Sequence, residues 1–261
     1  MQVRACQLGA DMGDAAARLK AIRWLIVDAA SDGADVIVLP ELALTGYGAG
    51  DSIRDAAETI DGETVTQLRQ LADENGIAVV TGIALREGET VINAALIVRP
   101  RQAPLVYAKQ HLFGPYEKAL FSAGNKSCEI FEVGGLKAAA LVCFDVEFPE
   151  RVRELAQAGA QVIFVPTALP AGASGKMVAE YVVPTRAFES QVFIVYVDHV
   201  GSDARFIYQG MSCIAAPDGS RIVSAPDNKP QLMSATLDPA DFAQSIADNP
   251  YLAELALHRR P

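Results

Sequence analysis

Three segments, far apart in the sequence, each carry a side chain suited to covalent catalysis. Glu41 follows an apolar run and a Leu-Pro pair, Lys109 follows a second short run, and Cys143 ends a third. A thiolate is a strong nucleophile, and a carboxyl group in apolar surroundings has the raised pKa that suits a general base. A nearby lysine favours the thiolate and donates to an oxyanion. Brought together, these groups would perform acyl transfer through a covalent intermediate.

Taken singly, each of these residues has a simpler explanation. A glutamate or lysine after a strand is more often a solvated turn residue, and a lone cysteine at a strand end is more often buried and inert. Cys143 differs from the other cysteines because Pro149 marks a helix start soon after it, which predicts a strand-to-helix turn with free backbone N–H groups. His111 also offers a Cys-His dyad, but no Asn or Asp lies near it in sequence to orient its ring, so that mechanism is the weaker one.

In this order, the segments resemble the nitrilase superfamily of carbon–nitrogen hydrolases. The matching stretches are Leu39-Pro40-Glu41, Lys109 before His111-Leu112, and Cys143-Phe144-Asp145-Val146-Glu147-Phe148-Pro149-Glu150. The resemblance covers nearly the whole chain and implies that Glu41 is the general base, Cys143 the nucleophile and Lys109 the third member of a triad. It also implies that Glu117, between the lysine and the cysteine, holds Lys109 or positions the substrate.

The resemblance further implies where substrate atoms would lie. The oxyanion is expected between the Lys109 ammonium and the backbone N–H of Phe144. Tyr47, in a glycine-bearing loop that could close over the site, and Ala168, at the start of the 168–175 loop, are expected to contact the substrate. That loop contains no arginine or lysine to grip a substrate carboxylate, which favours a neutral or cationic amide.

The residues after the cysteine narrow the expected reaction. Phe144-Asp145 is similar to the amidase and carbamoylase side of the family, whereas nitrilases tend to have Trp-Glu there. We therefore expect an amidase, similar to the bacterial aliphatic, R-stereoselective and 5-aminopentanamide amidases, that releases ammonia from a small carboxamide. The alternatives are an N-carbamoyl amino acid or ureido hydrolase, a nitrilase, a catalytically silent binding or regulatory protein of the same fold, and a metal-dependent hydrolase. The last would use as ligands Glu41, Asp145, Glu147 and Glu150.

The elements that must position these residues alternate between short apolar strands and longer helical patterns. The expected strands are 3–8, 35–39, 77–85, 90–98, 105–109, 136–142, 161–165 and 192–197, with shorter ones at 212–215 and 231–234, and the expected helices are 14–30, 64–75, 148–158 and 176–190. Three of these strands, 77–85, 90–98 and 105–109, follow one another without a helix, which predicts an antiparallel meander in an α/β layered fold. The resemblance implies more: a four-layer αββα sandwich with mixed sheets, paired as a homodimer or higher homo-oligomer.

Composition limits the class of protein. The chain has 261 residues, 51% of them hydrophobic, and no Pro/Gly/Ser-rich linker, which predicts a single domain over 1–261 with 249–261 as a C-terminal extension. A net charge of −10 argues against nucleic acid as a partner. The sequence contains no apolar run of about 18 residues, the length that a membrane span needs, so we expect no membrane partner. The strand pattern that begins at Val3 favours a cytoplasmic enzyme.

Cysteine and histidine usage argues against metals and disulfides. The four cysteines, which include Cys6, Cys128 and Cys213, are too few and too scattered for a disulfide framework, and the three histidines are dispersed. Neither spacing is typical of a zinc site. We therefore expect no metal and no cofactor.

Overall fold

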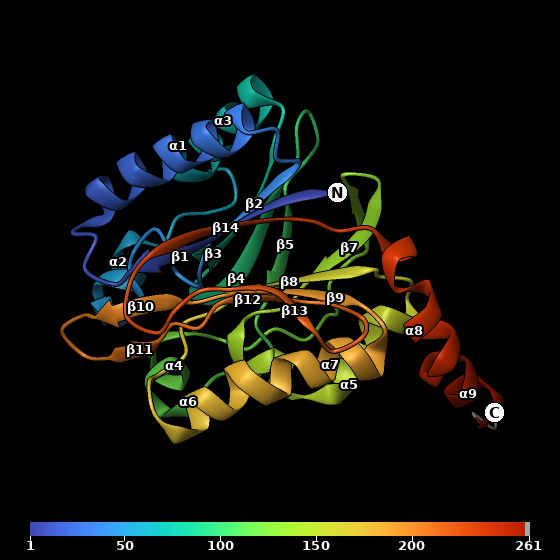
Figure 1. Ribbon diagram of the computed structural model, residues 1–261. Helices are drawn as coiled ribbons and strands as arrows, with labels where there is room; N and C mark the ends of the chain where they lie inside the picture. The colour runs from blue at the N-terminus through green and yellow to red at the C-terminus, as the bar shows by residue number, and fades with distance from the viewer. Residues whose placement is uncertain (259–261) are drawn as a thin grey trace.

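The structure, a computed structural model, describes residues 1–258 and contains two β-sheets that face each other. The first sheet has the strand order β11-β10-β1-β2-β3-β4-β5, with β14 also paired to β1, and the second has the order β13-β12-β9-β8-β7-β6. Helices α1 and α3 cover the outer face of the first sheet, and α5 and α7 cover the outer face of the second (Figure 1). This is the expected four-layer αββα sandwich.

The elements have the following bounds. The strands are β1 (Gln2–Gly9), β2 (Val36–Val38), β3 (Ala78–Glu87), β4 (Thr90–Val98), β5 (Leu105–Ala108), β6 (Phe131–Val133), β7 (Leu136–Ala140), β8 (Val162–Pro166), β9 (Phe193–Val197), β10 (His199–Ser202), β11 (Ile207–Gln209), β12 (Cys213–Ala215), β13 (Arg221–Ser224) and β14 (Gln231–Thr236). The α-helices are α1 (Ala15–Ser31), α2 (Ser52–Ala56), α3 (Glu63–Asn75), α4 (Gly114–Leu120), α5 (Pro149–Gln157), α6 (Ala173–Met177), α7 (Val183–Ser190), α8 (Ala243–Asp248) and α9 (Tyr251–His258). Shorter helical turns are η1 (Tyr47–Ala49), η2 (Cys143–Glu147), η3 (Val178–Val182) and η4 (Pro239–Phe242).

Both sheets are mixed, as predicted. Strands β1, β2 and β3 are parallel, and the meander β3-β4-β5 is antiparallel. In the second sheet, β7, β8 and β9 are parallel and carry antiparallel neighbours at both ends. Strands β2, β8 and β9 are buried on both faces, which explains their nearly unbroken runs of Val, Ile and Phe.

The strands deliver the candidate site residues to one edge of the sandwich. Glu41 follows the end of β2, Lys109 follows β5, Cys143 follows β7, and Ala168 follows β8. The carboxyl ends of strands are where α/β folds place their ligands, because the chain leaves the hydrogen-bonded ladder there and exposes free polar groups. A backbone hydrogen bond from Glu41 N to Thr167 O, 3.2 Å long, joins the two sheets at this edge.

Two expected elements differ in detail from the structure. The predicted helix 176–190 is helical throughout and ends at Ser190, but it begins at Ala173 and consists of α6, the π-turn η3 and α7 without a gap. Pro184 lies in the first turn of α7, where it has no N–H to donate, and the Val183 N–H bonds to the Val178 carbonyl five residues earlier. The predicted strand 136–142 ends at Ala140, because the chain then turns into η2 to present Cys143.

The C-terminal stretch packs against α7. The Gln191 side chain donates to the carbonyls of Ile246 and Asn249 and accepts from Leu252 N, and the Tyr251 ring meets Phe188 edge-on. Residues 259–261 of the predicted extension lie outside the described residues.

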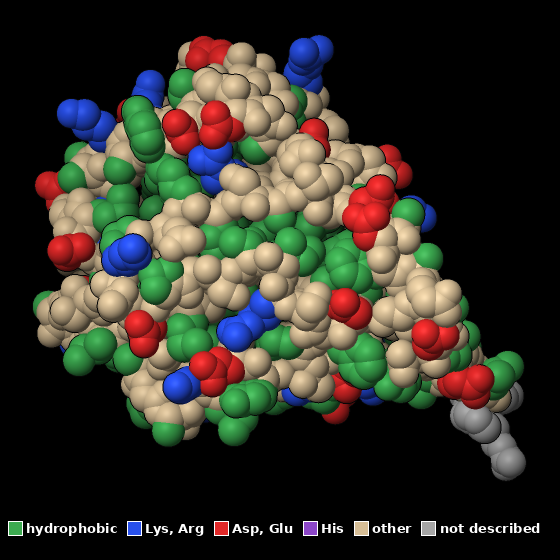
Figure 2. Space-filling model, in the orientation of Figure 1, with side chains coloured by type: hydrophobic (Ala, Val, Ile, Leu, Met, Phe, Trp, Pro, Cys, Tyr) green, Lys and Arg blue, Asp and Glu red, His purple; other side chains and the backbone are tan. Residues whose placement is uncertain are grey.

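None of the helices described over 1–258 is both long and apolar enough to cross a bilayer. On the face shown in Figure 2, acidic and basic side chains are scattered among uncharged ones and do not form a basic patch.

Candidate active site

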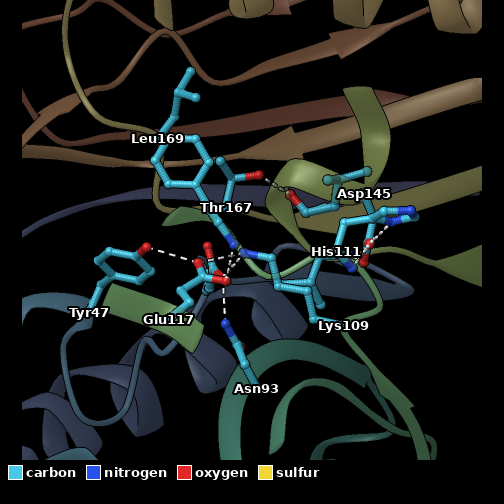
Figure 3. A network of polar contacts seen from close by, with 12 residues as sticks. Tyr47, Asn93, Lys109, His111, Glu117, Asp145, Thr167 and Leu169 are labelled. Carbon is cyan, nitrogen blue, oxygen red and sulfur yellow. Dashed lines mark hydrogen bonds and ion pairs between the residues drawn. The ribbon is translucent and has the colours of Figure 1, made fainter. Parts of the chain in front are cut away.

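An ammonium group held between two carboxylates forms the centre of the site (Figure 3). Lys109 Nζ lies 2.8 Å from Glu41 Oε1 and 2.6 Å from Glu117 Oε1, and all three side chains are fully buried. Burial alone would lower the pKa of Lys109, but the negative charges of Glu41 and Glu117 raise it above its ordinary value. The lysine is therefore a permanent cation in a water-poor pocket.

Glu41 has one oxygen engaged and one free. Its Oε1 accepts from Lys109 and, at 2.6 Å, from Asn93 Nδ2, whereas its buried Oε2 has no hydrogen-bond partner within residues 1–258. Burial raises the pKa of Glu41, Lys109 opposes this, and the Glu117 carboxylate adds to it. The result is a carboxylate with an unused oxygen and a raised pKa, which are the properties of a general base.

Hydrogen bonds from two other segments hold the backbone around Glu41 in place. His199 Nε2 lies 2.8 Å from the Glu41 carbonyl oxygen, and burial lowers the pKa of His199 to about 4, so the neutral ring donates from Nε2. Gly82 in β3 is the second support: its N–H donates to Pro40 O, and its carbonyl accepts from Ala43 N. The loop that carries the carboxylate is thereby tied to both β3 and the start of β10.

Gly82→Ala is expected to displace Glu41. A Cβ at residue 82 would lie 2.2 Å from the Glu41 Cα and 2.5 Å from Leu42 N, so backbone must move. A shift of about 1 Å in a catalytic group costs on the order of 100-fold in rate, and we expect at least that loss in kcat/KM. Activity assays and thermal unfolding would measure the effect. The matched control is Gly76→Ala, whose Cβ meets no heavy atom within 4 Å and which strains only a left-handed helix end. Equal losses in the two variants would contradict the prediction.

Glu117 is held in place from three directions. Its Oε1 accepts from Tyr47 Oη at 2.8 Å and from Lys109, and its Oε2 accepts from Phe113 N at 2.8 Å. The glutamate lies in α4, one turn from the N-terminus, and Tyr47 lies in η1. Tyr47 therefore contacts Glu117 and lines the carboxylate cluster from the side opposite Lys109, as Figure 3 shows.

Cys143 begins η2 in a strained backbone conformation. Its φ of +47° is in the left-handed region, which a non-glycine residue adopts at a cost of about 1 kcal/mol or more. Residue 143 is 6% exposed, and its thiol receives a hydrogen bond from the backbone of Ala168. Burial and the Glu41 carboxylate raise the pKa of Cys143 well above its ordinary value, against the opposing effect of Lys109. The resting form is therefore a neutral thiol that needs a base to attack.

Asp145 joins the lysine segment to the cysteine turn. This buried carboxylate accepts from Tyr107 Oη at 3.0 Å and from His111 N at 2.9 Å, and its Oδ1 lies 2.8 Å from His111 Nδ1. The His111 ring also stacks on Phe148, with the ring centroids 3.8 Å apart. No Asn or Asp lies near His111 in the sequence, but in the structure the imidazole faces Asp145.

Phe144 follows the nucleophile candidate directly and packs its ring edge-on against Phe113 and Phe148. Sequence reasoning missed Asn93 and His199 as neighbours of Glu41. A polar residue inside the apolar run 91–98 was the available signal for Asn93, whereas nothing in the sequence pairs His199 with residue 41.

Within residues 1–258, no three His, Cys, Asp or Glu side chains are placed to hold a metal ion. Glu41 and Asp145, considered above as ligands, bind a lysine and a histidine instead.

A model of the carbon-nitrogen hydrolase family matches residues 2–247. The chain belongs to this family. The resemblance seen in the sequence is thereby confirmed, and the carbon–nitrogen hydrolase has relatives with named activities. A nitrilase from Pyrococcus abyssi is 35% identical, with 82% of this chain and 80% of that protein covered. An (R)-stereoselective amidase from a Pseudomonas species is 32% identical, with 86% and 81% covered.

Solved structures of an amidase of the nitrilase superfamily from Nesterenkonia sp. AN1 superimpose on this carbon–nitrogen hydrolase over nearly its full length. One, a mutant in complex with butyramide, has a TM-score of 0.86 and 30% identity and covers 99% of this chain and 96% of its own. Another shows the result of Michael addition of acrylamide at the active-site cysteine of that amidase. The fold and the relatives together identify an amidase-type hydrolase of the nitrilase superfamily.

Proposed function

We propose that this enzyme hydrolyses a small neutral or cationic carboxamide to a carboxylate and ammonia through a thioester on Cys143. The observation that carries the proposal is the Lys109 ammonium between Glu41 and Glu117 in the immediate electrostatic surroundings of the Cys143 thiol. Acid, cation and sulfur are thus present together, and the proposed reaction needs all of them. The amidase relatives support the choice of an amide as substrate.

In the acylation half-reaction, the free Oε2 of Glu41 takes the thiol proton as Cys143 attacks the amide carbon. The carbonyl oxygen becomes an oxyanion, which accepts hydrogen bonds from Lys109 Nζ and from the backbone N–H of Phe144. The tetrahedral intermediate collapses when protonated Glu41 gives its proton to the leaving nitrogen. Ammonia departs, and the acyl group remains on the sulfur as a thioester.

In the deacylation half-reaction, Glu41 is again a carboxylate and takes a proton from a water molecule. The resulting hydroxide attacks the thioester carbon, and the oxyanion returns to the same two donors. The sulfur leaves with the proton from Glu41, which restores the thiol and releases the carboxylic acid. Glu117 keeps Lys109 in position throughout, Tyr47 orients Glu117, and Ala168 N–H stabilises charge on the sulfur.

An ammonia-release screen tests the proposal. The substrates are short aliphatic amides, ω-amino amides, N-carbamoyl amino acids and nitriles, and Cys143→Ala is the blank. We expect release from amides that disappears in the blank. Release from nitriles alone would favour a nitrilase, and release from N-carbamoyl compounds alone would favour an N-carbamoyl amino acid or ureido hydrolase. No release from any class, with slow alkylation of Cys143 by a small electrophile at neutral pH, would favour a catalytically silent binding protein.

The pH profile of kcat/KM for butyramide is a further prediction. Activity requires ionised Glu41, so it falls as pH decreases through the raised pKa of that group, and the acid limb lies above pH 4.5. The pKa of Cys143 is raised well above 9.0, so ionisation of the thiol causes no loss below that pH. Butyramide does not titrate over this range, and unfolding followed at each pH controls for stability. An acid limb below pH 4.5 would contradict the assignment of Glu41.

The assembly is a proposal taken from the family resemblance, and the location is one taken from the composition of the chain. We propose a homodimer or higher homo-oligomer and a cytoplasmic location. Light scattering of the purified full chain tests the first, and a purely monomeric mass at micromolar concentration would contradict it. Cell fractionation tests the second.

A further inference from the structure

The hydrogen-bonded ladder between β8 and β9 ends where the chain crosses from one sheet to the other. The last backbone bond of this parallel pair runs from Thr167 N to the Val197 carbonyl, at 2.8 Å. A continued parallel ladder would bring the next N–H on that side, that of Leu169, to the carbonyl of His199. However, His199 begins β10 in the other sheet, and its carbonyl accepts from Gly210 N at 3.1 Å. The Leu169 N–H therefore needs another acceptor.

The side chain of Asp198 supplies this acceptor. Asp198 is the residue between β9 and β10, and its Oδ1 accepts a hydrogen bond of 2.8 Å from Leu169 N. The backbone N–H of Asp198 donates to Ser212 Oγ, also at 2.8 Å, so the aspartate side chain starts from a fixed point. The carboxyl group thus extends the ladder by one bond beyond Thr167.

Burying this carboxyl group is unfavourable for the fold. Asp198 is fully buried, and its Oδ2 has no hydrogen-bond partner within residues 1–258. Burial raises the pKa of Asp198 well above its ordinary value, and the bond from Leu169 N opposes this effect. A buried carboxyl group with one unpaired oxygen destabilises a protein, which indicates that its contact with Leu169 serves the site rather than stability.

The peptide group between Thr167 and Ala168 lies directly before this contact and connects two parts of the site. Its carbonyl accepts from Glu41 N at 3.2 Å, and its N–H donates to the Cys143 thiol. Figure 3 shows Thr167 beside the carboxylate cluster. Because a peptide group is planar, a rotation of the chain here moves both contacts together.

Bonds on both sides of Ala168 fix the direction of its N–H. In an extended chain, successive N–H groups point to opposite sides. The N–H groups of Thr167 and Leu169 both point to the side of β9, where a backbone carbonyl and Asp198 bind them. The Ala168 N–H therefore points to the other side of β8, where β7 lies and from which Cys143 follows.

We propose that Asp198 is a positioning residue, which directs the Ala168 N–H at the Cys143 sulfur by fixing Leu169. The inference rests on the proposed function in one respect, that Cys143 is the nucleophile. An N–H directed at the sulfur favours the thiolate over the thiol. A misdirected N–H therefore slows both steps in which the sulfur carries negative charge, the attack on the amide and the departure from the thioester.

Two substitutions separate the acceptor from the charge. Asp198→Ala removes the acceptor and is expected to lower kcat/KM for butyramide by about 10- to 100-fold, because small displacements of catalytic donors have effects of that order. Asp198→Asn keeps an acceptor oxygen and is expected to stay within about fivefold of the wild type. Val65→Ala, in the buried face of α3, is the control for stability: it is expected to lower the unfolding temperature and to leave kcat/KM unchanged.

The reactivity of Cys143 distinguishes positioning from a general structural effect. The rate of its modification by methyl methanethiosulfonate at pH 8, followed by peptide mass mapping, needs no amide turnover. We expect this rate to be about threefold to tenfold lower in Asp198→Ala, because the thiolate fraction falls when the pKa of the thiol rises further. The rate is expected to recover in Asp198→Asn and to be unchanged in Val65→Ala.

The outcomes separate this inference from the proposed function. If folded Asp198→Ala stays within twofold of the wild type in both rates, or loses no more than Asp198→Asn, the inference is overturned while the proposed function stands. If Asp198→Ala does not fold, Asp198→Ser, whose side chain ends one bond short of Oδ1, takes its place with the same expectations. If the wild type hydrolyses no amide but the modification rates follow the expected order, the proposed function fails and the positioning role of Asp198 is supported.

Discussion

Glu41→Gln is expected to lower kcat/KM for amide hydrolysis by about three to four orders of magnitude, with the fold intact. The amide keeps the volume of the side chain and an oxygen that can accept from Lys109 and Asn93. It cannot take a proton from the Cys143 thiol, whose pKa is too high for spontaneous ionisation at neutral pH. Steady-state kinetics, with thermal unfolding to show that the variant folds, measures the effect.

The double variant Glu41→Gln/Cys143→Ala provides the control. If the base acts only through the nucleophile, the double variant is no less active than Cys143→Ala alone, because residues that act as one unit give non-additive losses. A Glu41→Gln variant within tenfold of the wild type would show that another group takes the thiol proton.

Lys109→Met has the second large expected effect, on both activity and stability. It removes an oxyanion donor, which costs on the order of 100- to 1,000-fold in kcat. It also leaves the fully buried Glu41 and Glu117 facing each other without a cation, a situation that destabilises proteins by about 3 kcal/mol or more. Kinetic assays and denaturant unfolding at several pH values measure the two effects.

The destabilisation by Lys109→Met has a definite pH dependence. Without the lysine, the mutual repulsion of Glu41 and Glu117 raises their pKa values in the folded state above those of the unfolded chain. The folded state then binds more protons than the unfolded state, so stability falls as pH rises through the raised pKa values and recovers towards acid. Lys118→Met, which removes an exposed lysine on the same helix as Glu117, is the control. A Lys109→Met loss of stability that is independent of pH would contradict this explanation.

The sequence predicts the parts of the fold that depend on local pattern. Apolar β-branched runs correctly predict the buried strands β2, β3, β8 and β9, because burial on both faces leaves no polar alternation. The meander β3-β4-β5 follows from turns that are too short to hold a helix. The αββα arrangement came from the family resemblance, since periodicity does not indicate how two sheets pack.

The site residues that belong to a sequence motif were predictable. Those that are neighbours only in the folded structure were not. The order of the three motifs identifies Glu41, Lys109 and Cys143 as candidate catalytic residues, and the structure places them at one edge of the sandwich. The supports of the site come from pairings distant in sequence, such as His199 on the Glu41 carbonyl and Asp145 on His111. Such pairings depend on the register of strands and on side-chain direction, and neither can be read from a single sequence.

The four cysteines allow the thioester mechanism to be tested directly. Cys6, Cys128 and Cys213 are buried, and burial raises their pKa values to about 12, 11 and 12. Glu41 and Lys109 act on the Cys143 thiol but not on these three, so only Cys143 is expected to react. The measurement is acid quench of the wild-type enzyme during turnover of butyramide, followed by peptide mass mapping. We expect a butyryl group on the peptide that contains Cys143 and on no other cysteine. Butyrate formation at the full rate with no acyl group on Cys143, from the first turnover onward, would contradict it.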